Sequence, residues 1–65
     1  MGRIKRGGYI FEFWVGGHPP RHVHVFKEGK FICKIRTKDM TLMEGRAGRR
    51  IMNILKALIK EGLVV

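Results

Sequence analysis

The sequence has little cysteine, few prolines and few acidic residues. Its one cysteine, Cys33, excludes an intrachain disulfide. Its two prolines are adjacent, and Pro19-Pro20 fixes the backbone and removes two donors, which ends a strand there. No apolar run approaches the roughly eighteen residues of a membrane-spanning helix, and the amino terminus lacks the apolar stretch of a signal peptide. We therefore expect a cytoplasmic protein with no membrane partner.

Negative charge is scarce, because five Asp and Glu face fourteen Lys and Arg, for a net charge of +9. Such a surface attracts polyanions, since each neutralised phosphate releases condensed counterions. The charge predicts an anionic partner, either RNA, DNA or an acidic protein, ahead of the alternative that it serves only solubility. The 65 residues are expected to form one domain, residues 1–65. A domain of this size hides only about 60% of its surface on folding.

Alternating apolar residues and turn glycines predict an antiparallel sheet. Residues 9–15 are rich in aromatic and β-branched side chains, which is typical of a strand. Gly7-Gly8 can turn a short first strand, residues 3–6, back onto it. Residues 22–26 and 31–37 are interpreted as two further strands.

The turn Glu28-Gly29 joins the last two of these strands and predicts their register. As a two-residue loop it makes opposed positions sum to a constant. The opposed pairs are then Phe26 with Phe31, His24 with Cys33, and His22 with Ile35. This register predicts one face with His22, His24 and Cys33, and another face with Val23, Val25 and Ile32.

After a polar, flexible connector at residues 38–46, the apolar period changes to that of a helix. Apolar side chains recur at Ala47, Ile51, Ile54, Leu55 and Leu58. An amphipathic helix from about Gly45 to Glu61 fits this pattern, and Gly62 suits its carboxyl end. The apolar residues 63–65 are expected to dock on their own domain or on a second subunit.

The predicted fold class is α+β: an antiparallel meander of three to four strands with one C-terminal amphipathic helix packed on one face. The face without the helix keeps large apolar groups, drawn from Trp14, Ile10, Val23, Val25 and Ile32. Because small monomers rarely expose such patches, the fold predicts a homodimer or a dedicated partner.

All three histidines lie in the segment His18-Pro19-Pro20-Arg21-His22-Val23-His24. Residues two apart on a strand point the same way, so His22 and His24 present their imidazoles side by side. His18 from the proline loop and Cys33 from the facing strand would complete a nitrogen and sulfur set that zinc accepts. No carboxylate is clearly placed beside this set as a partner for the ligands.

The same histidines suit a second chemistry. His22 and His24 would act as acid and base in phosphodiester cleavage, and Arg21, Lys34 or Arg36 would stabilise the developing charge, with Arg21 preferred. In the third interpretation both are half-buried strand residues whose ring nitrogens bond the proline loop. Cys33 is interpreted as a small buried apolar residue rather than a reactive thiol.

Basic residues suited to phosphate contact form two groups. The strand at residues 31–37 and its flanks carry one group, and the start of the helix carries the other. They are Lys30, Lys34, Arg36 and Lys38, and then Arg46, Arg49 and Arg50. Cations two apart on a strand track a phosphate backbone. Tyr9, Trp14 or Phe26 would stack on unpaired bases where exposed, although aromatic residues of small domains more often lie in the core.

The sequence resembles a family of small uncharacterised domains, domain of unknown function 4160. The residues that carry the resemblance are Gly7-Gly8-Tyr9 with Phe11, Phe13 and Trp14, then His18-Pro19-Pro20-Arg21-His22-Val23-His24, Gly29, and the helix at residues 51–59. Genes of this family often stand beside those of another small domain, in pairs that look like type II toxin-antitoxin modules. The resemblance therefore implies a prokaryotic two-gene system with a cognate small protein encoded nearby.

These features predict a small basic binding domain of a toxin-antitoxin-like or regulatory module, with nucleic acid or an acidic protein as partner and with no cofactor. Two alternatives stay open. One is a histidine-dependent ribonuclease, and the other is a metal-binding domain that holds zinc through the histidine-rich segment.

Overall fold

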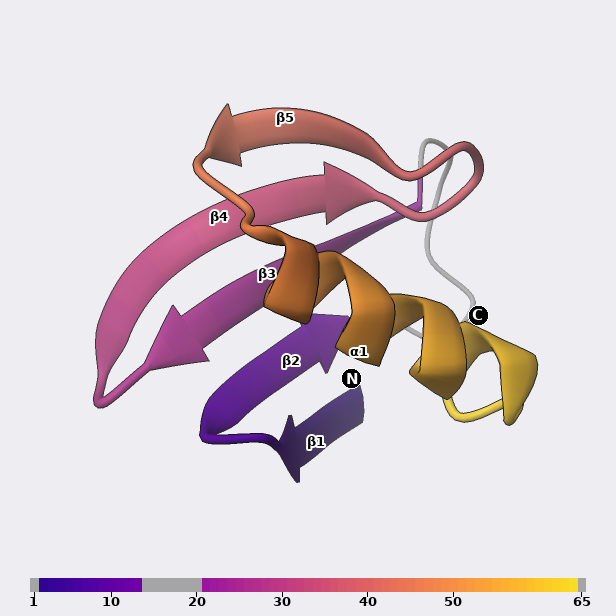
Figure 1. The fold of residues 1–65 in the computed structure, drawn as a ribbon, viewed down its shortest axis with the longest axis horizontal. Helices are drawn as coiled ribbons and strands as arrows, with labels where there is room; N and C mark the ends of the chain where they lie inside the picture. Colours follow the sequence, from indigo (N-terminus) through magenta and orange to yellow (C-terminus); the bar gives the residue numbers. More distant parts are fainter. Residues whose placement is uncertain (1, 14–20, 65) are drawn as a thin grey trace.

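Within residues 2–13 and 21–64, the part of the chain that the computed structural model describes, five strands precede one helix (Figure 1). The strands are β1 (Gly2–Arg6), β2 (Tyr9–Phe13), β3 (His22–Lys27), β4 (Lys30–Arg36) and β5 (Thr41–Gly45), and the helix is α1 (Arg49–Lys60). The sheet order is β1-β2-β3-β4-β5 and every neighbouring pair is antiparallel. Helix α1 crosses one face of this meander, which has β1 and β5 at its edges (Figure 1).

The core lies between α1 and one face of the sheet. The strands contribute the buried side chains of Phe11, Phe13, Val23, Val25, Cys33 and Ile35. The helix contributes Ile51, Leu55 and Leu58, which are four and three residues apart and so share one side of α1. Of residues 63–65, which were expected to dock, Val64 is buried in the core, Leu63 is 45% exposed, and Val65 lies outside the described residues.

A glycine marks each end of helix α1. Gly48 is its N-cap, so the helix begins four residues later than the expected Gly45. At the other end Gly62 has a φ of +78°, and the Leu63 N–H donates to the Leu58 carbonyl at 3.0 Å. A left-handed glycine with this reversed hydrogen bond is a common helix stop. Helix α1 is too short and too polar to span a membrane, and it is the one helix among the described residues.

The α+β class is confirmed, but the predicted strand count of three to four is wrong, because residues 38–46 contain β5. All five residues of β5 are exposed. An edge strand that buries nothing has no need for apolar alternation, which is the signal that finds strands in a sequence. The turn before it depends on Met40, with a φ of +59°, and on Asp39, whose carboxylate accepts the Thr41 N–H at 3.2 Å.

The predicted register of the β3–β4 hairpin is correct at its turn and wrong beyond it. Phe26 pairs with Phe31, but a β-bulge then shifts the register by one residue. Ile32 is the extra residue on β4, and the pairs that follow are Val25 with Cys33, His24 with Lys34, Val23 with Ile35 and His22 with Arg36. A shift of one residue moves every side chain to the other face. Cys33 therefore lies in the core, not beside the histidines.

The bulge also changes which apolar groups lie away from α1. Val23 and Val25 are buried in the core, and Ile32 packs against it. Of the residues expected on the uncovered face, Ile10 is half-buried and Trp14 lies outside the described residues. The homodimer stays a prediction, but most of the apolar surface on which it depended is in the core.

Candidate nucleic-acid interface

The sheet face opposite α1, here called the open face, carries a row of charged side chains. Strand pairing aligns one residue from each strand, in the order Arg3, Glu12, His24, Lys34 and Glu44. Arg3 lies 3.7 Å from Glu12, and Lys34 lies 3.9 Å from Glu44. His24 therefore stands at the centre of the open face, between an acidic and a basic neighbour.

Aromatic rings gather around His24 on the same face. The His22 and His24 rings meet edge to face, with centroids 5.0 Å apart. The Phe31 ring lies 6.1 Å from that of His24 and 5.7 Å from that of Phe26. We call His24, Phe26 and Phe31 the ring cluster. Phe31 is 44% exposed, so the cluster presents an apolar ring to solvent.

The surroundings of His24 disfavour its protonation. Partial burial, the charge of His22 and the charge of Lys34 lower the pKa of His24, against a smaller opposite effect of Glu12 and Glu44. The neutral imidazole is thus favoured at neutral pH. A neutral ring stacks on a nucleobase and also accepts a proton, so this environment suits base binding and general-base chemistry alike.

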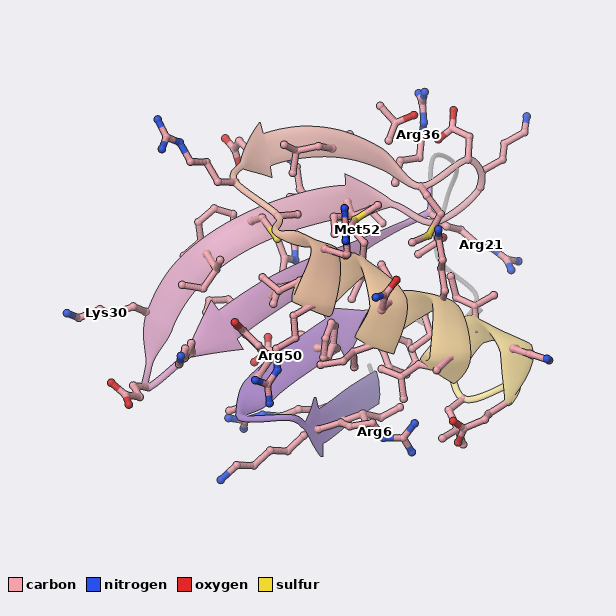
Figure 2. All side chains as sticks on the ribbon, viewed as in Figure 1. Arg6, Arg21, Lys30, Arg36, Arg50 and Met52 are labelled. Carbon is pink, nitrogen blue, oxygen red and sulfur yellow. The ribbon has the colours of Figure 1, made fainter. Side chains whose placement is uncertain are left out.

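The residues predicted for catalysis are brought together only in part. His22 and His24 share the open face and touch. Arg21 lies just before β3, where its carbonyl accepts the Thr37 N–H at 3.1 Å, and its side chain extends away from the fold (Figure 2). A catalytic role for these three residues remains a prediction.

The predicted metal set does not assemble. Cys33 lies in the core, on the opposite side of the sheet from His22 and His24, and burial raises the pKa of its thiol. His18 lies outside the described residues. Among residues 2–13 and 21–64, no group of three or more His, Cys, Asp or Glu side chains is placed to hold a metal ion. The zinc hypothesis requires the Cys33 sulfur as a ligand, and Cys33 does not lie on the same side of the sheet as His22 and His24.

The seven predicted phosphate-binding residues separate into three places. Lys30 is at the tip of the β3–β4 hairpin, and Arg50 extends from the start of α1 over the β1–β2 turn (Figure 2). The Arg46 N–H donates at 3.3 Å to the carbonyl of Ile32, two residues after Lys30 in β4, and Arg49 is the first residue of α1. We call Lys30, Arg46, Arg49 and Arg50 the basic end. Lys34 is in the middle of the open face, and Arg36 and Lys38 are at the β4–β5 turn.

Ion pairs neutralise some of these cations and leave others available. Arg36 makes two contacts with the Asp39 carboxylate, at 2.8 and 3.1 Å, which lower the pKa of Asp39. Lys34 pairs with Glu44. The basic end takes part in none of the four ion pairs found among the described residues. It is therefore the stronger attractor of an anion.

Phe31 is the residue that sequence reasoning missed. The sequence predicts its pairing with Phe26 correctly and names Phe26 as a stacking residue, but a register without a bulge puts Phe31 on the same side of the strand as Cys33 and Ile35. The signal in the sequence is that three consecutive residues of β4, Phe31, Ile32 and Cys33, are all apolar. A strand with one buried face alternates apolar and polar residues, and this run breaks the alternation at the position of the bulge.

The fold and this face define a small basic α+β domain with a five-stranded sheet that is covered on one side. Residues 8–62 match the family model described as Domain of unknown function (DUF4160). The chain belongs to that family, as the resemblance indicated. No curated protein and no solved structure gives a significant match.

Proposed function

We propose that this domain binds single-stranded nucleic acid, with bases on the ring cluster and phosphates on the basic end. The observation that carries the proposal is an exposed aromatic ring, Phe31, on an uncovered sheet face, next in sequence to Lys30, which takes part in none of the ion pairs found among the described residues. Stacking on aromatic rings tolerates any base, and a charged groove tracks the backbone.

The sequence of β4 supports this placement, because Lys30 and Phe31 are adjacent and Lys34 follows on the open face. A strand of nucleic acid along β4 would meet a cation, a ring and a second cation. The Lys34 Nζ lies 3.9 Å from the Glu44 carboxylate, and Glu44 is 63% exposed, so this long ion pair is weak enough to exchange for a contact with a phosphate. A duplex keeps its bases stacked inside and gains nothing from the rings.

The test is binding of a fluorescein-labelled twelve-nucleotide oligouridine, measured by anisotropy. Stacking is worth about 1–3 kcal/mol per base, so Phe31→Ala is expected to weaken binding about 5- to 150-fold. Leu63→Ala is the matched control, because Leu63 is 45% exposed and Phe31 is 44% exposed. If Phe31→Ala and Leu63→Ala bind the oligouridine with equal affinity, the ring cluster is not part of the interface.

A charge-matched pair tests the basic end. Lys30→Gln with Arg46→Gln is compared with Lys56→Gln with Lys60→Gln, which removes the same charge from exposed positions of α1. Contact with four phosphates predicts that log K falls against log salt with a slope of about −3, at about −0.7 per phosphate. The first double variant should flatten this slope by about one to two, whereas the second should leave it unchanged. A flat slope in the unmodified protein contradicts the proposal.

A ribonuclease is the second candidate, favoured by the contact of the His22 and His24 rings beside Lys34. Cleavage would use the neutral His24 as base. The same oligouridine is incubated with the protein and its products are separated by size, with oligodeoxythymidine as a substrate that lacks the 2′-hydroxyl. Cleavage of RNA alone that His22→Gln abolishes, with binding retained because His22 is outside the ring cluster, would establish the enzyme. Intact RNA in a tight complex would show that the domain only binds it.

The proposal also includes a protein partner, namely the product of the second gene in the two-gene module that the resemblance implies. A cognate small protein encoded nearby would compete with nucleic acid for the same cations. Co-expression of the neighbouring gene, followed by gel filtration with and without oligouridine, tests whether the complex and the nucleic acid exclude each other.

A further inference from the structure

The outer side of β5 has no neighbouring strand among the described residues, because β5 stands at the end of the sheet order. Its five residues, Thr41–Gly45, are all exposed. Outward N–H and C=O groups of an edge strand are a template for another extended segment. The edge is therefore a surface on which a partner strand can hydrogen-bond.

The two edges of the sheet differ in how well they resist such pairing. Edge β1 carries Arg3, Lys5 and Arg6, and positive side chains are a common protection of an edge. Edge β5 has one charged residue, Glu44, beside Leu42 at 44% and Met43 at 40% exposure. The register against β4 shifts between Leu42 and Glu44, and both apolar side chains are exposed to solvent. The pairing surface is therefore at β5.

Charge surrounds this edge at both ends. Lys38 lies in the turn before β5, close to Arg36 at the end of β4, which is paired with Asp39; Arg46 follows β5 immediately, and Arg49 begins α1. A strand of five residues is about 17 Å long, so an incoming strand would place its two ends beside these two cation groups. Acidic residues at both ends of that strand complement the surface.

A second copy of this chain fits the edge less well. Antiparallel pairing of β5 with itself sets the Thr41 end of one copy against the Gly45 end of the other. Lys38 of one copy would then approach Arg46 of the other, and each copy carries a net charge of +9. Like charges placed opposite each other oppose association.

We propose that β5 receives an extended segment of an acidic protein as a sixth strand, with an apolar residue against Leu42 and acidic residues at each end. The main-chain edge of β5 is separate from the ring cluster, although Arg46 and Arg49 of the basic end also flank this edge, so strand addition is tested by the main-chain contacts and not by these cations. The mode is β-augmentation, in which main-chain bonds supply affinity and side chains supply selectivity.

The test uses a synthetic nine-residue peptide, Asp-Glu-Val-Thr-Val-Glu-Val-Asp-Glu, and isotope-labelled protein. Nuclear magnetic resonance should show shifted signals and slowed amide exchange at residues 41–45. A control peptide with proline in place of the first and last valines has the same charge but loses two main-chain donors. It should bind at least tenfold more weakly. Equal binding of both peptides, or changes confined to the cations of α1, would overturn the proposal.

A pair of protein variants separates strand addition from general attraction. Leu42→Lys and Leu63→Lys add the same charge at positions of similar exposure. Attraction alone would strengthen binding of the acidic peptide in both variants. Strand addition predicts that Leu42→Lys weakens it about tenfold and Leu63→Lys does not. A dimer at micromolar concentration that Leu42→Lys converts to monomer would assign the edge to a second copy and refute the proposal.

Discussion

Replacing Gly45 by alanine tests the place of β5 most directly. Gly45 has a φ of +76°, and a Cβ there would overlap the Ile32 carbonyl oxygen and lie 2.9 Å from the Cys33 Cα. Both obstacles are backbone, so they cannot rotate away. The left-handed conformation costs a non-glycine residue about 1–2 kcal/mol, and the forced backbone shift adds about 1–3 kcal/mol.

Gly29 is the matched control for this substitution. Its φ is +78°, but nothing lies within 4 Å of a Cβ built there. Gly29→Ala should therefore cost only the conformational part, about 1–2 kcal/mol. In a domain of this size each kcal/mol lowers Tm by about 4–8 °C. Gly45→Ala should fall below Gly29→Ala by at least about 5 °C.

The assay is thermal and urea unfolding followed by circular dichroism, with the m-value checked for two-state behaviour. Total stability for a chain of this length is roughly 3–10 kcal/mol, so Gly45→Ala removes a large part of it. If residues 38–46 were the open connector that the sequence suggested, both alanines would cost the same. Equal losses would therefore refute the packing of β5 on β4.

Three further predictions concern titration and the core. Because the pKa of His24 is lowered in the folded chain from its ordinary 6.5, the unfolded chain binds this proton first as pH falls, so stability should decline below about pH 6.5. Urea unfolding at pH 7.5 and 5.5 should show the decline, and a His24→Gln variant that retains it in full would contradict the assignment. Arg6 lowers the pKa of Glu61 across their 2.6 Å contact, so stability tied to this pair should be lost as pH falls below the ordinary value of 4.5; Glu61→Gln should remove that part of the acid transition, and an unchanged transition would argue against the pair. Cys33 should react with a thiol reagent only in denaturant, and Cys33→Ser should cost about 1–3 kcal/mol; rapid labelling of the native protein would show that Cys33 is not in the core.

The parts of the fold that bury apolar surface could be predicted from the sequence. Ile51, Leu55 and Leu58 have helical spacing because each must reach the core, and the alternation of Phe11 and Phe13 follows from the same need. β5 buries none of its residues, so its sequence carries no such period. Its position comes from tertiary contacts that bring Gly45 and Arg46 to the backbone of Ile32.

The candidate site could be predicted only up to the bulge. The pairing of Phe26 with Phe31 follows from the turn, which is local. The extra residue, Ile32, is stabilised by its packing on the core and by the Arg46 N–H on its carbonyl, and both contacts come from residues distant in sequence. Local pairing rules do not include contacts from residues distant in sequence. They therefore predict that Cys33 lies beside the histidines, which is the arrangement that the zinc hypothesis requires.

The bulge also explains how one short strand serves both the core and the open face. In a regular strand Phe31 would share a face with Cys33 and Ile35, and its ring would be buried beside them. The extra residue reverses the alternation between Phe31 and Cys33, so Phe31 joins Lys34 and Arg36 on the open face while Cys33 and Ile35 stay in the core. A single irregularity thus places an aromatic ring and two cations on one uncovered surface. Bulges are common where a strand redirects a side chain, and in β4 the failure of local register prediction lies at the residues that form the candidate interface.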